Sequence, residues 1–167
     1  MCKLDESIKA LADYVDVDRM LNATGVAPFW IKDTNLRFLR YNQAMIDILY
    51  PTAKFDDLKN KADWEYFESV GYSKEEVQSI KDGCKMSDED VLQGEAPSQK
   101  YFEFVKSTDG KELWLLTTKV KIPPTKKKEK AKGIYGTAII FEAAPKIIES
   151  GILKIEKLTE SCYKILE

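Results

Sequence analysis

The first 25 residues carry apolar side chains at the spacing of an amphipathic helix. Charged and polar residues fill many of the positions between them, and Gly25 follows as a stop signal. The apolar stripe consists of Leu4, Ile8, Leu11 and Val15. We therefore expect an N-terminal helix over residues 1–25 with one apolar face to cover.

Two short apolar runs come next, and a helix follows them. The runs "PFWIKD" and "LRFLRY" are rich in aromatic and branched residues and flank a polar turn at residues 33–35, which predicts two strands. Asn42 precedes "QAMIDILY", a segment that ends at Pro51. Its side chain can accept hydrogen bonds from the first free backbone N–H groups of a helix, so we expect Asn42 to be a helix cap.

The next part of the chain predicts further helices. The run "DDLKNKADWEYFESVGYS" breaks often, which predicts short helical turns with Asp63 as the cap of "WEYF". Ser73 and Glu76 have the spacing of a capping box, so a longer helix begins after Ser73. We expect this helix to be interrupted near Gly83 and to end at Gly94.

After Pro97 the apolar period changes to two, which is typical of strands. The run "KYFEFVKSTDGKELWLLTTKVKIP" predicts a hairpin that turns at residues 108–110, and its second strand has apolar residues on both faces, as a central strand does. The run "GIYGTAIIFE" predicts a last strand, and the segment after Pro145 predicts a terminal helix. This order indicates an α+β domain in which helices cover one face of a five-stranded antiparallel sheet.

Composition and charge exclude several classes of function. The chain has 167 residues, of which 44% are hydrophobic and 32% charged, as in a globular domain. Its formal charge of −2 gives no sign of a nucleic-acid partner. The lysine-rich run "KKKEKAK" is interpreted as a solvated hairpin loop. No apolar run approaches the ~20 residues that cross a bilayer, and acidic residues occupy the N-terminal segment where a signal peptide would be apolar. We expect a cytoplasmic protein without nucleic-acid or membrane contact.

The absence of histidine from the sequence removes the usual general base and the commonest zinc and haem ligand. Cys2, Cys84 and Cys162 lie far apart and lack the spacing of metal ligands. No nucleophile elbow or phosphate-binding glycine loop occurs. We therefore assign no catalytic residue and no metal site, and we expect that the protein is not an enzyme.

Five segments of the chain follow one another in a family-specific order. They are "PFWIKDTNLRFLRYNQAM", "KADWEYF", "VLQGEAPSQKYFEF", "STDGKELWLLTTKVKIP" and "GIYGTAIIFE". On these segments the chain resembles a PAS domain, a sensory module common in prokaryotic signalling proteins. The resemblance implies a five-stranded sheet that encloses a core or a small cavity with its helices. It divides the chain into an N-terminal helix (1–25), a sensor domain (26–143) and a C-terminal connector helix (144–167).

The resemblance also bears on cofactors and ligands. The cysteine motif of the family's flavin-binding light sensors is missing around Cys84, and an axial histidine for haem is missing too, so both cofactors are disfavoured and the cofactor is unknown. The fold would bring bulky and hydrogen-bonding side chains toward the space between sheet and helices, where they could bind a small carboxylate or an aromatic compound, with Arg40 holding the anion. The alternative is that the rings are core and Arg40 pairs with a surface acid. The candidate ligand-binding residues are Trp30, Arg40, Trp64, Tyr66 and Trp114.

The segment after Pro145 has an apolar seam at alternating spacings of three and four residues, as in a short coiled coil. Its charged residues stay outside the seam. We expect the chain to form a homodimer through its terminal helices, with packing back on the domain as the alternative. The expected interface residues are Leu4, Ile8, Leu11, Val15, Ile148, Ile155, Leu158, Cys162 and Ile165.

These expectations together describe a sensory module of signal transduction, for example in a two-component system. A small ligand or a partner would shift the helix packing, and the C-terminal helix would relay the shift to an output domain of the same longer chain, such as a histidine kinase or a cyclase. One alternative is a ligand-free dimerisation or protein-docking module. Another is a small-molecule carrier or an enzyme subunit of related topology.

Overall fold

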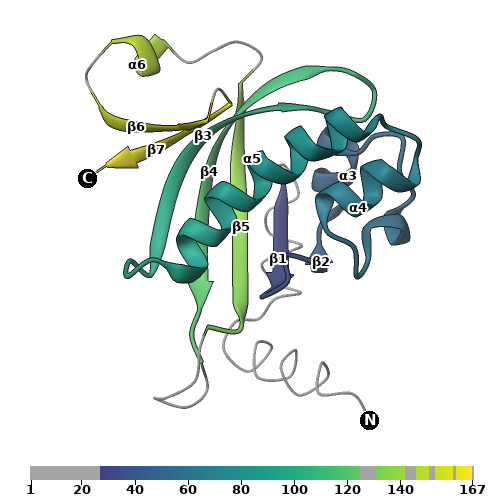
Figure 1. The fold of residues 1–167 in the computed structure, drawn as a ribbon, viewed down its shortest axis with the longest axis horizontal. Coiled ribbons are helices and arrows are strands. Elements are labelled where there is room, and N and C mark those ends of the chain that lie inside the picture. Colours follow the sequence, from purple (N-terminus) through teal and green to yellow (C-terminus); the bar gives the residue numbers. More distant parts are fainter. Residues whose placement is uncertain (1–26, 125–130, 142–145, 151–152, 160, 167) are drawn as a thin grey trace.

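The computed structural model describes residues 27–124, 131–141, 146–150, 153–159 and 161–166. These residues form one antiparallel sheet of seven strands in the order β2-β1-β5-β4-β3-β7-β6 (Figure 1). The strands are β1 (Phe29–Asp33), β2 (Phe38–Tyr41), β3 (Ser98–Lys106), β4 (Glu112–Ile122), β5 (Gly133–Phe141), β6 (Lys154–Thr159) and β7 (Cys162–Leu166). The first five strands confirm the predicted α+β fold, with β4 in the middle of the sheet.

The helices lie between β2 and β3 in the sequence and cover one face of the sheet (Figure 1). They are α3 (Gln43–Leu49), the 3-10 turn η1 (Phe55–Leu58), α4 (Asp63–Ser69) and α5 (Lys74–Gln93), and a short helix α6 (Lys146–Glu149) follows β5. Asn42 caps α3 as predicted, because its side chain accepts a hydrogen bond from the Met45 N–H at 3.0 Å. The Asn42 side-chain oxygen also accepts from the Phe29 N–H at 3.1 Å, which ties the start of β1 to α3.

The helix α5 runs without interruption from Lys74 to Gln93 and crosses the sheet diagonally (Figure 1). The predicted capping box is present, since the Ser73 hydroxyl accepts from the Glu76 N–H and the Glu76 carboxylate accepts from the Ser73 N–H. The predicted interruption near Gly83 is wrong, because a glycine costs a helix interior about 1 kcal/mol and tertiary packing readily offsets that amount. The helix ends at Gly94 as expected.

The predicted connector helix over residues 144–167 is also wrong for most of its length. Only Lys146–Glu149 is helical among its described residues, and the remainder forms β6 and β7, which pair with each other. The strand β7 pairs with β3, for example Glu103 with Cys162. Without β7 the long edge of β3 would present unpaired backbone groups, and this edge overrides a marginal helical pattern. The predicted N-terminal helix over residues 1–25 lies outside the described residues.

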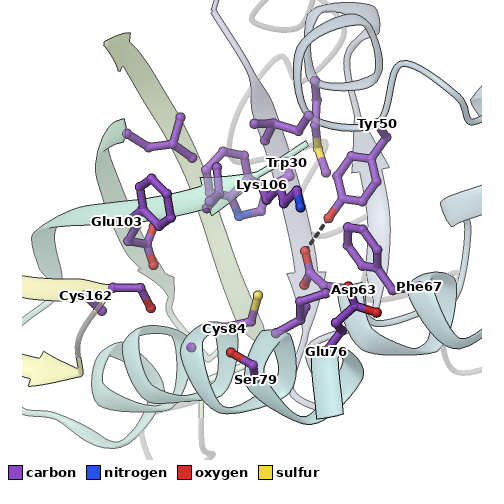
Figure 2. A pocket seen from close by; sticks show the side chains of 18 of the residues that line it. Trp30, Tyr50, Asp63, Phe67, Glu76, Ser79, Cys84, Glu103, Lys106 and Cys162 are labelled. Atoms are coloured by element: carbon purple, nitrogen blue, oxygen red, sulfur yellow. Dashed lines mark hydrogen bonds between the residues drawn. The ribbon is translucent and has the colours of Figure 1, made fainter. Parts of the chain in front are cut away.

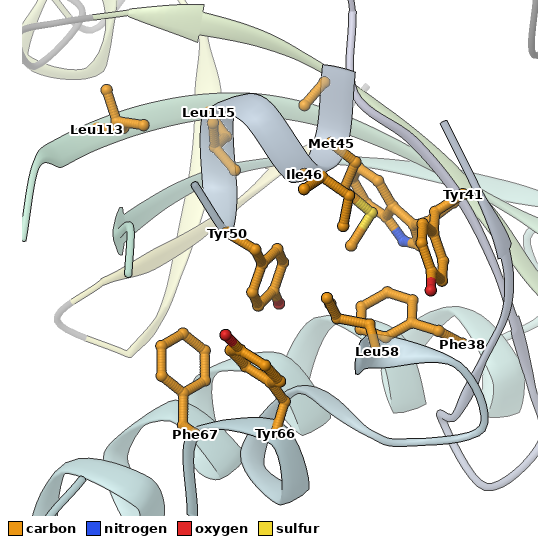
Figure 3. Close-up of a cluster of buried hydrophobic side chains, with 12 residues drawn as sticks. Phe38, Tyr41, Met45, Ile46, Tyr50, Leu58, Tyr66, Phe67, Leu113 and Leu115 are labelled. Carbon is orange, nitrogen blue, oxygen red and sulfur yellow. The ribbon is translucent and has the colours of Figure 1, made fainter. Parts of the chain in front are cut away.

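The main core is an aromatic cluster between the sheet and the helices α3, η1 and α4 (Figure 3). The rings of Phe38, Tyr50, Tyr66 and Phe67 meet mostly edge to face, as between Tyr50 and Tyr66, whose centroids lie 5.5 Å apart at 83°. Edge-to-face pairs add about 0.5–1.5 kcal/mol each to the free energy gained from burial alone. This cluster forms the hydrophobic core at one end of the helix–sheet layer.

Candidate functional site: a cavity between sheet and helices

A cavity of about 320 Å³ lies between the sheet and α5, beside the aromatic cluster (Figure 2). This volume is in the range of small-molecule sites. Its wall is mostly apolar and includes Met45, Leu49, Phe67, Ile80, Val105 and Leu115. Three lining residues, Glu76, Ser79 and Lys106, are exposed, so the cavity reaches solvent beside the first half of α5.

Trp30 forms part of the sheet side of the cavity, and its position depends on a glycine of the neighbouring strand. Trp30 on β1 pairs with Gly136 on β5. A Cβ atom at Gly136 would lie 2.5 Å from two carbon atoms of the Trp30 indole, so the ring can lie flat across β5 only where the facing residue lacks a side chain. The indole Nε1 is buried and has no hydrogen-bond partner among the described residues.

Two buried lysines on the sheet face the helices, where a chain of carboxylates meets them. The Lys32 ammonium donates to Asp63 at 2.6 Å and to Asp88 at 2.7 Å. The Lys119 ammonium donates to the other Asp88 oxygen at 2.6 Å, to Glu103 at 2.8 Å and to the Ser87 hydroxyl at 2.5 Å. Asp88 on α5 therefore joins a lysine of β1 to a lysine of β4.

The network extends to both ends of the cavity. At the α4 end, the Tyr50 hydroxyl donates to Asp63 Oδ1 at 2.5 Å, shown as the dashed line in Figure 2. At the β3 end, the Ser87 hydroxyl donates to Glu103 Oε1 at 2.5 Å and the Thr117 hydroxyl donates to Glu103 Oε2 at 2.8 Å. Lys32, Lys119, Asp63 and Glu103 all line the cavity.

The electrostatics of the network keep its lysines charged. Burial alone disfavours the ammonium form of Lys32, but the carboxylates of Asp63 and Asp88 outweigh burial and raise the pKa of Lys32. Burial opposes the charge of Lys119 in the same way, and Asp88 and Glu103 raise its pKa. Burial disfavours the Asp88 carboxylate too, yet its two lysine partners lower the pKa of Asp88.

The wall formed by α5 contributes a thiol. Cys84 is half-buried, and burial first and the charge of Asp63 second raise its pKa well above the usual value, so the thiol is neutral at pH 7. Beside α5, the turn between β6 and β7 completes the wall with Ser161 and Cys162, and Ser161 Oγ lies 3.8 Å from the position that a Cβ at Gly83 would take. The C-terminal hairpin is therefore part of the cavity.

Of the five predicted ligand-binding residues, the structure places one on the cavity wall and four elsewhere. Trp30 lines the cavity, whereas Arg40 is exposed at the outer strand β2 and is not part of the cavity wall that the described residues form. Tyr66 is 2% exposed and packs in the aromatic cluster. Trp64 is half-buried on α4, with the Lys81 ammonium 5.8 Å from its ring centroid. Trp114 alternates with the cavity residue Leu115 along β4, which places it on the other face of the sheet.

Some roles differ from the prediction. Asp63 is not the cap of α4, because Ala62 occupies that position and the Glu65 carboxylate accepts from the Ala62 N–H at 3.0 Å. The Asp63 carboxylate is instead turned inward toward Lys32. Of the predicted dimer residues, Leu4, Ile8, Leu11 and Val15 lie outside the described residues. The helical seam is wrong for the strand residues Ile155, Leu158, Cys162 and Ile165, and Cys162 is only 1% exposed.

The charged residues of the network were missed in the sequence, although a signal for them exists. Lys119 falls in the buried phase of β4, after Leu113, Leu115 and Thr117. Lys32 ends an otherwise apolar run, "PFWIK". A lysine in the buried phase of a strand requires a buried carboxylate partner, so two such lysines predict an internal ion-pair network.

Neither a metal-binding cluster nor a membrane-spanning helix occurs among the described residues. No group of three or more cysteine, aspartate or glutamate residues among them has the arrangement of a metal site. No helix in the described part of the chain is long and apolar enough to cross a membrane.

Comparison with known proteins gives a likeness of structure and not of sequence. No protein-family model matches the chain, and no curated protein matches its sequence. The solved structure described as VqmA bound to DPO matches with a TM-score of 0.53 at 16% identity, covering 78% of this chain and 60% of that one. This chain thus spans about three fifths of the VqmA structure.

Two isolated PAS domains match over nearly their whole length. The PAS domain of BvgS from Bordetella pertussis has a TM-score of 0.53 at 18% identity, covering 80% of this chain and 92% of that domain. A PAS domain from Colwellia psychrerythraea has a TM-score of 0.52 at 8% identity, covering 77% of this chain and 98% of that domain. At these identities the likeness concerns the fold. The chain has a PAS-like fold, extended at the β3 edge by β7 and β6.

Proposed function

We propose that this chain is a sensory module that binds a small molecule in the cavity between α5 and the sheet, and that it is not an enzyme. The observation that carries the proposal is the cavity itself, about 320 Å³ of mostly apolar space with a few polar groups along one side. An unfilled apolar space of this size costs stability, because its lining atoms lose packing partners. A bound molecule would recover those contacts.

Trp30 Nε1 and the fold comparison support the proposal. A buried N–H without a partner costs free energy, and a ligand acceptor that reached it would remove the cost. The VqmA structure is described as bound to DPO, so one protein of this fold holds a small molecule.

The relay that we propose runs through the C-terminal hairpin in place of the expected helix. The Phe104 N–H on β3 donates to the Ser161 carbonyl at 2.7 Å, and Ser161 and Cys162 lie on the cavity wall. A ligand between α5 and β3 would bias the position of this turn. The signal is a population shift between two packings, so the ligand must bind one of them more tightly than the other.

The output that receives the signal stays a prediction. A histidine kinase or a cyclase in a longer chain is the expectation from the sequence, together with a homodimeric, cytoplasmic assembly. A DNA-binding output is a further candidate, because one matching structure is described as a VqmA–ligand–DNA complex. The ligand-free docking module is the competing function, and it predicts that nothing binds in the cavity.

A thermal-shift screen against a metabolite library tests the proposal. A ligand at about 100 times its Kd should add about 2.7 kcal/mol to the free energy of unfolding. Two substitutions on α5 locate the site. Cys84→Phe adds a ring to the cavity wall and should abolish the shift, while Cys84→Ser keeps the volume and should retain it. A compound that stabilises both variants equally binds elsewhere, and a library without any stabilising compound would favour the docking module.

A further inference from the structure

The buried ion-pair network has an excess of negative charge. Three carboxylates, Asp63, Asp88 and Glu103, meet two ammonium groups, Lys32 and Lys119, which leaves one negative charge in excess. Side chains of four of these groups line the cavity, and the fifth, Asp88, lies behind them with 0% exposure. At the exposed rim, Glu76 and Lys106 carry opposite charges and offset each other. The network that borders the cavity therefore carries a net negative charge once Asp88 behind the wall is counted.

The cationic groups of the network are already committed to carboxylates. Lys119 has three N–H donors, and it donates to Ser87, Asp88 and Glu103. Lys32 is shared between Asp63 and Asp88, and its ammonium lies 4.8 Å from the centroid of the Phe38 ring. A ligand carboxylate could pair with Lys119 only by displacing one of its three acceptors, and at Lys32 it would compete with Asp63 and Asp88 for the same ammonium charge.

The three carboxylates keep more unused hydrogen-bond acceptor sites than the two lysines keep unused donors. Each carboxylate can accept about four hydrogen bonds. Asp63 accepts from the Tyr50 hydroxyl and from Lys32, and Glu103 Oε2 accepts from the Thr117 hydroxyl. Figure 2 shows Asp63 and Glu103 toward opposite ends of the cavity, so a donor group could approach a carboxylate at either end.

We infer that the cavity takes a small, mostly apolar molecule that carries a positively charged, hydrogen-bond-donating group, such as a primary amine, and that it rejects carboxylates. The inference rests on the proposed function and adds the class of ligand. A bound ammonium would balance the excess charge, whereas a bound carboxylate would place a second uncompensated charge in a poorly solvated site. Among the described residues, Trp30 Nε1 is the one group that favours a ligand with an acceptor. The free energy gained by pairing this neutral N–H is smaller than the free energy lost by burying an unpaired carboxylate charge.

Three probes with one phenyl ring and different polar groups test the charge preference. They are 2-phenylethylamine, 2-phenylethanol and 3-phenylpropionate, each titrated into the full chain at pH 7 by calorimetry. We expect the amine to bind on the order of tenfold or more tightly than the carboxylate, with the alcohol in between. A carboxylate that binds as tightly as the amine overturns the inference, and so does a lack of binding by all three at millimolar concentration.

Neutralising one acid at a time tests whether the network sets this preference. Asp63→Asn and Glu103→Gln each remove the excess charge with little change of shape, and at least one should weaken amine binding on the order of tenfold. Glu112→Gln is the matched control, because it makes the same chemical change at an exposed position of β4. If amine affinity is the same in both network variants and the control, the inference is wrong. Circular dichroism shows whether each variant folds. If neither network variant folds, the relative affinities of the three probes for the unmodified chain test the inference on their own.

The outcomes separate this inference from the proposed function. If 3-phenylpropionate binds and Cys84→Phe abolishes its binding, the cavity is a ligand site with another charge preference. If the amine alone binds and Cys84→Phe abolishes its binding, both proposals hold. If neither the probes nor the metabolite library bind, both fail.

Discussion

The layer between the helices and the sheet is built in two ways at its two ends. Beside α3 and α4 it is a cluster of interlocking aromatic rings (Figure 3), and beside α5 it is a chain of alternating carboxylates and ammonium groups. Ring packing tolerates small shifts of the side chains, because each van der Waals contact is weak and the stabilisation is the sum of many. A buried ion network tolerates few, because each charge depends on its partners.

The cavity lies where these two regions meet. Tyr50 belongs to the aromatic cluster through its ring and to the network through its hydroxyl, which donates to Asp63. Burial and the charge of Asp63 raise the pKa of Tyr50, so it remains a neutral donor. A ligand in the cavity would touch rings on one side and charges on the other, which gives it both shape and charge selectivity.

The network should be the more fragile of the two regions. Asp88→Ala removes the carboxylate that bridges Lys32 and Lys119 and leaves both ammonium groups with fewer partners. We expect a loss of about 3–5 kcal/mol in the free energy of unfolding, measured by chemical denaturation. Glu89→Ala is the control, since its ion pair with Lys85 is about 40% exposed on each side, and it should cost no more than about 0.5 kcal/mol. Equal effects of the two substitutions would contradict the buried network.

The aromatic region should respond to lost volume. Leu58 is fully buried among the rings, and Leu58→Ala should cost about 2–4 kcal/mol, since the cavity that it leaves closes only in part. The neighbouring element offers a control in Val70→Ala, because Val70 is 49% exposed and should change stability by less than about 0.5 kcal/mol. A small effect at Leu58 would mean that this end of the layer is loosely packed.

Substitution of Gly136, which faces the Trp30 indole, should destabilise the fold by a smaller amount. Gly136→Ala forces the indole away from β5, and overpacking of this kind costs about 1–3 kcal/mol. Gly83→Ala makes the same change in α5, where a Cβ would meet its nearest atom at 3.8 Å, and should instead stabilise by up to about 1 kcal/mol. Thermal melts of the two variants test this opposition, and two shifts of the same sign would refute it.

Acid should weaken the network gradually. The folded-state pKa of Asp88 is lowered, so its contribution is fully present above the unfolded pKa near 4 and is lost as the pH falls through the folded value. One such group changes stability by at most about 1.4 kcal/mol per pH unit. Denaturation at pH 3–6 should show a shallower decline for Asp88→Asn than for the unmodified chain. A decline of the same slope in both would exclude Asp88 as a titrating group of the network.

Local patterns predicted the first five strands well and the ligand site poorly. The hairpin turns, the cap at Asn42 and the capping box at Ser73 depend on neighbours in the sequence, and all three were predicted correctly. The cavity depends on side chains brought together from β1, β3, β4 and α5, and no local pattern reports how they meet. Trp30 was found because it is large and lies on a strand, whereas Arg40 shares those properties and is exposed.

The C-terminal segment shows the limit of periodicity in another way. Apolar residues three and four positions apart suggested a helix, yet β6 and β7 form there because β3 has an open edge. An edge is a property of the folded sheet and cannot be seen in the segment that pairs with it. For the same reason, the local pattern placed Cys162 in a dimer seam, whereas the structure buries it in the core.

Native mass spectrometry tests the central claim, a ligand site in the cavity, most directly. The unmodified chain and Cys84→Phe are incubated with the same small-molecule extract and measured side by side under non-denaturing conditions. The account predicts one added compound per chain on the unmodified protein, released on denaturation, and none on Cys84→Phe. An equal mass addition on both proteins, or no addition on either, would contradict it.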